Sequence, residues 1–244
     1  MRLPQTLLFS VLLWIADVQS QTPVLTPPVL SVSRGQNATF TCDVGVKDDY
    51  ATAFLSHIPG EAPMFLLYHH HSYSAPKYGP GISSANFTSN VNSAGTEYQL
   101  LIKNAEVTDT ALYYCQKWYP PISVYVFSQS SKLIVTVDSF PKPSVLLFPP
   151  PSQELAADKT FTCHMSKLSV SLAKVRWTVD GTSTDTGVQT GLPSRDSDSS
   201  FSLSSYLTVP ASSMSPNKVY ACSIQQEGSV TITSEGLRLS ECAQ

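Results

Sequence analysis

Apolar and polar residues alternate with a period of two in many short stretches of the chain. The segment 38–42 reads ATFTC and the segment 161–165 reads FTCHM, with an apolar residue at every second position. Because successive side chains of a strand point to opposite faces, this alternation predicts strands with one buried face. We expect further strands over 96–102, 111–115, 132–137, 175–179, 201–209 and 218–224, separated by turns such as Pro59-Gly60, Gly79-Pro80-Gly81 and Asp180-Gly181. Many short strands at this spacing predict an all-β fold.

The two halves of the chain repeat one cysteine pattern. In each half a cysteine on an early strand is followed much later by Tyr-x-Cys, at 113–115 and at 220–222, and Trp177 follows Cys163. This set is typical of an immunoglobulin sandwich, where a disulfide joins two antiparallel sheets, the Trp packs against it and the Tyr hydroxyl bonds the backbone. We therefore predict two immunoglobulin-like antiparallel β-sandwiches in tandem.

The predicted domain boundary lies at Val137-Asp138. The segment 139–143 that follows reads SFPKP and predicts an extended linker, since a proline keeps the residue before it out of helical geometry. Residues 21–137, with the wider cysteine spacing, predict a variable-type domain of nine strands. Residues 138–244 predict a constant-type domain of seven strands.

Residues 1–20 have the features of a secretory signal peptide. Arg2 is followed by an apolar run over 7–15, which is too short to span a bilayer, and by small residues before a cleavage site after Ser20. We prefer this interpretation to a buried helix of the mature fold. No later segment approaches the roughly 18 apolar residues of a membrane span. We therefore expect a secreted, extracellular chain, or one held at the cell surface through a membrane-bound partner.

Charge and cysteine content restrict the classes of partner and site. The net charge is −3 and no Lys/Arg-rich run occurs, which argues against binding to nucleic acid or to an anionic membrane. Five cysteines in an oxidising compartment predict disulfides, whereas their spacing does not match zinc-type Cys-x-x-Cys pairs. Cys242 is the odd cysteine near the end of the sequence, and it predicts an intermolecular bridge.

Several longer motifs resemble an immunoglobulin light chain over essentially the whole sequence. The second half carries PSVLLFPP (143–150), GVQT (187–190), SSYL (204–207) and the final Glu241-Cys242, and the first half carries PGEAP (59–63) and DTALYYC (109–115). The sequence is similar to the lambda and sigma light chains of cold-blooded vertebrates.

The resemblance implies disulfides and a surface for a heavy chain. The intradomain disulfides would be Cys42–Cys115 and Cys163–Cys222, and Cys242 would bridge to the heavy chain. Three residues would face the heavy variable domain, namely Pro63, Tyr114 and Phe127. Four would face the first heavy constant domain, namely Phe148, Thr162, His164 and Tyr206.

The resemblance also implies three antigen-binding loops, approximately at 44–52, 69–76 and 116–126. Tyr and Trp in exposed loops favour binding, because they offer a large contact area at little cost in rotamer entropy. We expect about half of these aromatic side chains to pack on the framework or the heavy chain instead. The predicted antigen-binding residues are Asp48, Asp49, Tyr50, His69, His70, His71, Tyr73, Trp118, Tyr119 and Tyr125.

Some framework positions depart from the family. Phe54 and Leu55 replace a core Trp and an interface Tyr, and Asn86 replaces an Arg that would pair with Asp109. The smaller ring at position 54 is expected to cost about 1–3 kcal/mol if a cavity remains. Two Asn-x-Thr sequons, at Asn37 and at Asn86, are predicted glycosylation sites.

The stretch VFSQSSKL (126–133) departs from the Phe-Gly-x-Gly-Thr-Lys joint of light chains, because Ser128 and Ser130 replace both glycines. In the family these glycines form a β-bulge, and glycine adopts positive φ without a clash of its side chain. Either the serines adopt such a conformation at a cost of about 1–2 kcal/mol, or the bulge flattens. In both cases we expect Phe127 to face the heavy domain from a somewhat altered strand.

No motif for catalysis or metal binding stands out. The run His69-His70-His71 offers imidazole ligands, but adjacent residues of an extended segment point to opposite sides and do not close on one ion. The sequence has no Gly-x-Ser-x-Gly elbow and no glycine-rich phosphate loop ahead of a helix. We expect no enzyme activity, no cofactor and no metal.

The interpretation that best unites these features is an antibody light chain, which pairs with a heavy chain and contributes loops to an antigen site. One alternative is a surrogate or invariant light chain that assists heavy-chain assembly. Another is a soluble receptor-like protein of the immunoglobulin superfamily.

Overall fold

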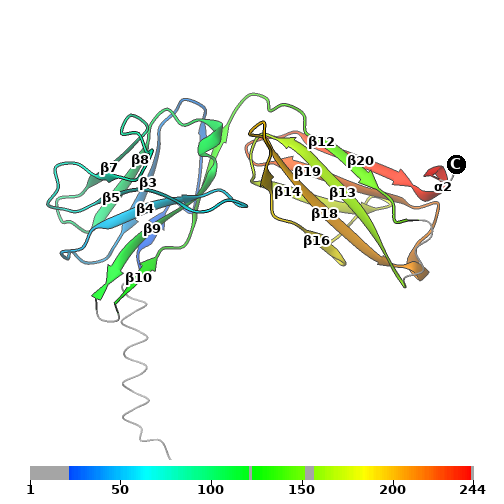
Figure 1. Cartoon of the computed structure of the whole chain (residues 1–244), viewed down its shortest axis with the longest axis horizontal. Coiled ribbons are helices and arrows are strands. Elements are labelled where there is room, and N and C mark those ends of the chain that lie inside the picture. The colour runs from blue at the N-terminus through cyan, green and yellow to red at the C-terminus, as the bar shows by residue number, and fades with distance from the viewer. Residues whose placement is uncertain (1–21, 121–122, 152–156, 243–244) are drawn as a thin grey trace, which may run out of the picture. The chain divides into compact units, whose positions relative to one another are not determined.

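The computed structural model describes residues 22–120, 123–151 and 157–242 (Figure 1). These residues form two compact units, with the strands β1 to β10 and most of β11 in the first and β12 to β20 in the second. Each unit consists of two β-sheets, which confirms the predicted all-β class with two tandem sandwiches. The predicted signal peptide lies outside the described residues.

The first sandwich has one sheet in the order β1-β3-β8-β7 and a second in the order β2-β11-β9-β4-β5-β6, with β10 also paired to β9. The described residues of the first sandwich form eleven strands. If β1 and β2 are counted as one interrupted strand, and β10 and β11 as another, the number becomes nine. The bounds are β1 Val24–Thr26, β2 Val29–Ser33, β3 Ala38–Asp43, β4 Thr52–His57, β5 Met64–His69, β6 Lys77–Tyr78, β7 Phe87–Val91, β8 Glu97–Ile102, η1 Val107–Asp109, β9 Ala111–Tyr119, β10 Val124–Phe127 and β11 Ser131–Thr136.

The second sandwich has one sheet in the order β12-β13-β18-β16, with β17 also paired to β18, and a second in the order β15-β14-β19-β20. Asp180 and Gly181, with φ of 50° and 77°, form the predicted turn between β14 and β15. The bounds are β12 Ser144–Phe148, β13 Asp158–Leu168, β14 Ala173–Val179, β15 Thr182–Thr184, β16 Val188–Thr190, β17 Ser194–Arg195, β18 Phe201–Pro210, η3 Ala211–Ser213, β19 Val219–Gln226, β20 Ile232–Arg238 and α2 Leu239–Cys242.

A disulfide and a stacked Phe–Tyr pair form the centre of both cores. The disulfides are Cys42–Cys115 and Cys163–Cys222, the two pairs that the resemblance implied. Beside the first, the rings of Phe40 and Tyr113 stack with centroids 5.3 Å apart. Beside the second, Phe161 and Tyr220 stack at 4.2 Å. Each aromatic residue precedes its cysteine by two positions, so the period of a strand places ring and sulfur on the same buried face.

The large ring that covers the disulfide differs between the domains. Trp177 pairs in register with Cys222, is fully buried, and donates its indole N–H to Ser205 Oγ across the sandwich at 2.9 Å. Phe54 takes the equivalent place opposite Cys115 and is completely buried. Phenylalanine therefore fills the core position of the first domain without a polar contact to the opposite sheet.

The corner before β9 is held by Tyr113, whose hydroxyl donates to the carbonyl oxygen of Asp109 at 2.8 Å. The Asp109 carboxylate accepts the backbone N–H of Glu106 at 2.8 Å. Within the described part of the chain Asp109 has no ion-pair partner, as the substitution at Asn86 predicted, and Asn86 itself is exposed. Burial raises the pKa of the Asp109 carboxyl above its usual range, because no cation offsets the loss of hydration.

Candidate binding surface

The outer face of the β4, β5, β9 and β10 sheet carries a continuous row of aromatic residues. Phe127 and Gln116 pair across β10 and β9, and Gln116 pairs with Ala53 of β4. One row further along, Tyr125 pairs with Trp118, and their rings meet edge to face at a centroid distance of 5.0 Å. Alternation along β9 and β10 therefore places Trp118 and Tyr125 of the predicted third loop on the same face as Phe127.

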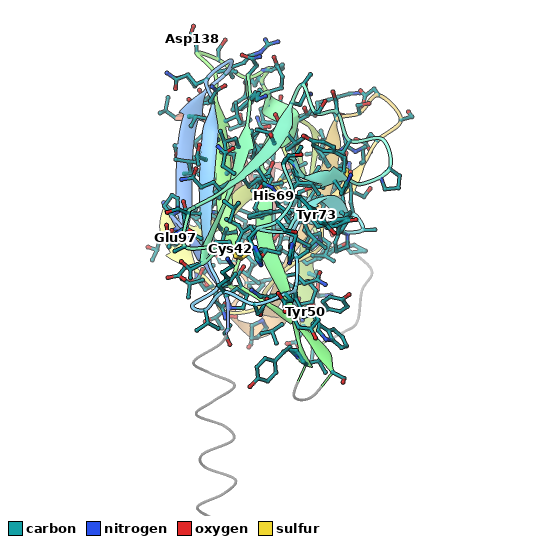
Figure 2. All side chains as sticks on the ribbon, turned by 90° about the vertical axis from the view of Figure 1, so that its left-hand side faces the viewer. Cys42, Tyr50, His69, Tyr73, Glu97 and Asp138 are labelled. Atoms are coloured by element: carbon teal, nitrogen blue, oxygen red, sulfur yellow. A yellow bond between two sulfur atoms is a disulfide. The ribbon has the colours of Figure 1, made fainter. Side chains whose placement is uncertain are left out.

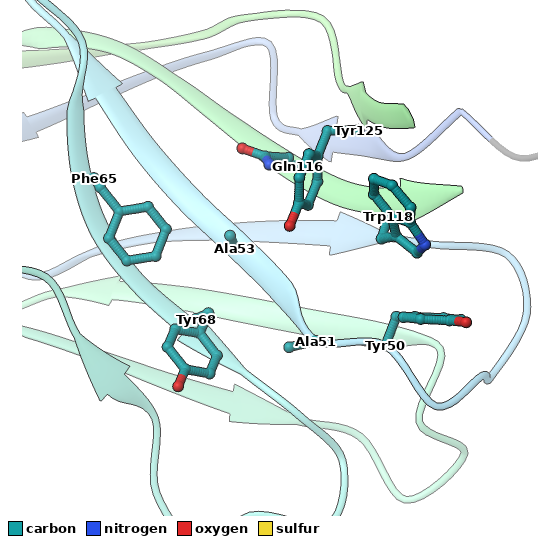
Figure 3. Close-up of a pocket in the computed structure, with 8 residues that line it drawn as sticks. All are labelled: Tyr50, Ala51, Ala53, Phe65, Tyr68, Gln116, Trp118 and Tyr125. Carbon is teal, nitrogen blue, oxygen red and sulfur yellow. The ribbon is translucent and has the colours of Figure 1, made fainter. Parts of the chain in front are cut away.

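These aromatic residues line an open pocket of about 500 Å³. Figure 3 shows Trp118 beside Tyr125 on one side of Ala53, and Phe65 and Tyr68 on the other. The small side chain of Ala53 forms the floor, and polar atoms come from Gln116 and the tyrosine hydroxyls. Such a pocket suits an apolar or aromatic group with one or two hydrogen-bonding atoms. The full lining is Tyr50, Ala51, Ala53, Phe65, Tyr68, Gln116, Trp118 and Tyr125.

Asp48 shapes the first loop at the edge of this pocket. Its Oδ1 accepts the backbone N–H of Tyr50 at 2.9 Å and lies 3.0 Å from Nζ of Lys117. The Lys117 side chain is only 8% exposed and Asp48 is about one-third exposed. Asp48 therefore neutralises a nearly buried lysine and orients Tyr50. Lys117 was missed from the sequence, although its inward position in the alternation of β9 signals its burial.

Two residues predicted to contact antigen lie inside the domain instead. His69 is 4% exposed and Tyr119 is 6% exposed, so neither offers its side chain to a ligand in this structure. Nδ1 of His69 lies 3.1 Å from Ser89 Oγ, and Nε2 lies 3.4 Å from the carbonyl oxygen of Tyr73. Figure 2 shows His69 next to Tyr73. Burial lowers the pKa of His69, since the charged imidazolium loses hydration there.

The other predicted loop residues are at least partly accessible. Asp49, Tyr50, Tyr73 and Tyr125 are exposed, and Asp48, His70, His71 and Trp118 are partly buried. The third loop is shorter than predicted, because β9 runs to Tyr119 and β10 begins at Val124. The strands thus support most of the residues assigned to this loop.

The positions assigned to the heavy variable domain lie on the same aromatic face. Tyr114 pairs in register with Leu55, which pairs with Phe65. Phe127 is 49% exposed, Pro63 and Phe65 are also exposed, and Tyr114 is partly buried. Large apolar side chains therefore remain uncovered on the face that the resemblance implied for pairing.

The four positions assigned to the heavy constant domain lie side by side on the β12-β13-β18 sheet. Phe148, Thr162 and Tyr206 are in register across the three strands, and Phe148 and Tyr206 are 50% and 40% exposed. His164 lies two residues along β13 from Thr162, hence on the same face, with Nδ1 3.1 Å from Ser204 Oγ. We call this set, with the exposed Leu146 that pairs with His164, the constant-domain face.

The joint at 128–130 keeps a β-bulge without glycine. Phe127 pairs with Gln116 and Ser131 pairs with Tyr113, so three residues on one strand oppose two on β9. Ser128 and Ser130 are not among the described residues with positive φ. Instead, Ser128 donates its N–H to the carbonyl oxygen of Cys115 at 2.9 Å, and its Oγ accepts the Cys115 N–H at 3.0 Å. The serines therefore neither adopt positive φ nor flatten the bulge, because the Ser128 hydroxyl accepts the backbone hydrogen bond from Cys115.

Replacing Ser128 by glycine, the residue of the family, is expected to destabilise the first domain by about 1–3 kcal/mol. The buried N–H of Cys115 would lose its acceptor, and glycine would add flexibility to the unfolded chain. Ser130→Gly is the matched control, since Ser130 is exposed and its change should stay within about 1 kcal/mol. Urea unfolding of both variants measures the difference, and equal stability of the two would contradict the role of the hydroxyl.

Both sequon asparagines are exposed at the surface of the first domain. Asn37 Oδ1 accepts the backbone N–H of Asn104 at 3.0 Å, and Asn104 has a φ of 49°. This bond leaves the Asn37 amide nitrogen available. Cys242, for which an intermolecular bridge was predicted, ends the short helix α2, and its side chain lies outside the described residues.

Comparison with protein families defines the class of the chain. Residues 25–136 match the immunoglobulin V-set domain, and residues 145–229 match the immunoglobulin C1-set domain. The chain therefore carries a V-set domain followed by a C1-set domain and is a protein of the immunoglobulin superfamily. This tandem order is consistent with an immunoglobulin-like chain. Among the described residues, no helix has the length and apolar character needed to cross a membrane.

Proposed function

We propose that the chain is an antibody light chain that pairs with a heavy chain and contributes loops to an antigen-binding site without catalysing a reaction. The observation that carries the proposal is that each sandwich exposes large apolar side chains on one sheet, at the positions where light chains meet heavy chains. Phe127 on the first domain and Phe148 and Tyr206 on the second are 40–50% exposed. Uncovered aromatic residues of this kind are characteristic of protein interfaces.

The aromatic pocket supports a binding role for the loop end of the first domain. Tyr50 comes from the loop before β4, Trp118 from β9 and Tyr125 from β10, and the three side chains line one cavity. Rigid aromatic side chains at such a place provide contact area with few rotatable bonds. Specificity would then depend on the loops and on the partner domain that completes the site.

Co-expression with an immunoglobulin heavy chain tests the proposal. We expect a disulfide-linked heterodimer on a non-reducing gel, which separates for Cys242→Ser while the two chains still co-elute on size exclusion. Cys242 would supply the covalent link and the two apolar faces the association. Recovery of the chain only as a monomer or a homodimer would contradict the proposal.

We also infer that the chain is secreted and that Asn37 and Asn86 carry glycans. Their exposure supports modification in the secretory pathway, and the Asn37 amide nitrogen is free of the contact that its oxygen makes. Thr39→Ala and Thr88→Ala remove the two sequons singly without changing either asparagine.

A further inference from the structure

The turn after β5 brings two imidazole rings together, contrary to the expectation that adjacent histidines diverge. The N–H of Tyr73 bonds the carbonyl oxygen of His70 at 2.9 Å, which closes a tight turn. The extended geometry thus ends at His69, and the rings of His70 and His71 lie with centroids 4.2 Å apart at an angle of 34°. Of these three histidines His69 is buried, and His70 and His71 are partly buried.

A carboxylate from another loop completes the group. Asp49 lies in the loop between β3 and β4. One of its carboxylate oxygens, one ring nitrogen of His70 and one ring nitrogen of His71 all lie within 4.8 Å of one another. Asp48 is not available to this group, because it is engaged with Lys117 and the N–H of Tyr50. Three metal-ligating side chains therefore converge from two loops of one domain.

The two imidazoles carry polar atoms that nothing in the described structure satisfies. Nε2 of His70 and Nε2 of His71 are shielded from solvent and have no hydrogen-bond partner among the described residues. An enclosed polar nitrogen without a partner costs free energy, and native proteins rarely retain one. Two such nitrogens on neighbouring rings, beside a carboxylate, are the arrangement that a bound cation would satisfy.

We propose that Asp49, His70 and His71 form a binding site for a divalent transition-metal ion, with Zn²⁺ as the best match. Two imidazole nitrogens and one carboxylate oxygen are a common zinc donor set, which leaves a fourth position for water or a ligand. Calcium and magnesium prefer oxygen donors throughout and fit this set poorly. Zinc bonds of about 2.0–2.2 Å require donor atoms roughly 3.3–3.6 Å apart, so the side chains close slightly around the ion. Asp49 is exposed, which leaves its carboxylate free to rotate inward.

Ser72 orients the first imidazole for this role. Its Oγ lies 2.7 Å from Nδ1 of His70, and its backbone N–H lies 3.2 Å from the same nitrogen. Nδ1 accepts from Ser72 in one tautomer and donates to Ser72 Oγ in the other. Metal binding at Nε2 places the ring proton on Nδ1, so it would break the bond that the Ser72 N–H donates to Nδ1 and keep the one between Nδ1 and Ser72 Oγ.

Occupation of the site would tie the first loop to the second. Asp49 is adjacent to Tyr50, which lines the aromatic pocket, so the ion would also restrain that edge of the pocket. All three ligands belong to the first domain, so the proposed metal site does not depend on pairing with a heavy chain. A negative result in the co-expression experiment would therefore not contradict the metal site.

Titration calorimetry of the full chain, expressed without an affinity tag, tests the site with ZnCl₂, and CaCl₂ serves as the comparison ion. Every variant carries Cys242→Ser, so that the odd thiol does not bind the metal. We expect one zinc per chain, a loss of affinity of at least about tenfold in His70→Ala, His71→Ala and Asp49→Asn, and no binding of calcium. His57→Ala, at the end of β4 and outside the proposed site, is the control and should bind zinc as the parent chain does.

A thermal melt separates metal binding from a change of fold. Zinc should raise the melting temperature of the parent and of His57→Ala. It should leave the melting temperatures of the three site variants unchanged, while their metal-free melts match that of the parent. Absence of zinc binding in the parent, or unaltered binding in the His70→Ala and His71→Ala variants, would overturn the proposal. Unaltered binding in Asp49→Asn would overturn the three-ligand site.

Discussion

Trp177→Ala is expected to lower the free energy of unfolding of the second domain by about 3–5 kcal/mol. The indole is fully buried opposite Cys222, so its removal leaves a cavity over the disulfide. The substitution also removes the donor to Ser205, whose Oγ additionally contacts Thr190 Oγ1 at 2.8 Å. The loss therefore combines cavity formation with a broken contact between the two sheets.

Trp177→Phe is the matched control, because the first domain naturally carries Phe54 at the equivalent place. We expect a smaller cost of about 1–3 kcal/mol, from the reduced ring and the lost indole N–H. Hydrogen exchange measured on the full chain resolves the two domains. The protection of backbone amides against exchange should fall in β13, β14, β18 and β19, and it should not change in β3, β8 and β9. Unchanged protection in the second domain would show that neighbouring side chains fill the space.

Phe148→Asp is expected to weaken association with a heavy chain by roughly 30-fold or more, which corresponds to about 2 kcal/mol. This prediction rests on the proposed pairing. Phe148 is half exposed in the free chain and lies in register with Thr162 and Tyr206. A carboxylate at its position would be desolvated without a partner when the constant-domain face is covered.

The affinity is measured in the Cys242→Ser background, so that the covalent bridge does not mask a weaker association. Val230→Asp is the control, since Val230 is 94% exposed in the turn before β20 and lies outside the constant-domain face. The melting temperatures of both free chains should remain close to that of the parent. Equal affinities for the heavy chain in the two variants would place the pairing surface elsewhere.

Local alternation was a sufficient guide to most strands and to the residues of both cores. The pattern ATFTC predicted β3, which spans Ala38–Asp43, and FTCHM predicted the middle of β13. The stacked rings beside each disulfide also follow from position, because Phe-x-Cys and Tyr-x-Cys place ring and sulfur on one face of a strand. These are properties of neighbouring residues, so they can be recognised without knowledge of the rest of the fold.

Contacts between distant segments were not predictable in the same way. The bond between Ser128 and Cys115 joins the segment between β10 and β11 to β9. The motif alone pointed to a missing glycine rather than to a serine hydroxyl that accepts a hydrogen bond. Likewise, His69 is buried because β5 extends to it and Ser89 lies opposite. The pair of Lys117 and Asp48 depends on how the first loop returns over β9.

The sequence by itself determined that this chain forms two disulfide-centred β-sandwiches, because periodicity assigns each strand residue to a buried or an open face and the cysteine pattern is typical of this fold. The positions that would meet a partner domain followed only from the resemblance to light chains. Only the tertiary structure decided which loop residues meet one another. It enclosed His69, gathered Trp118 and Tyr125 with Tyr50 around a pocket, and brought Asp49 to His70 and His71. Loop conformation follows from contacts between segments far apart in the chain, and no local pattern records them.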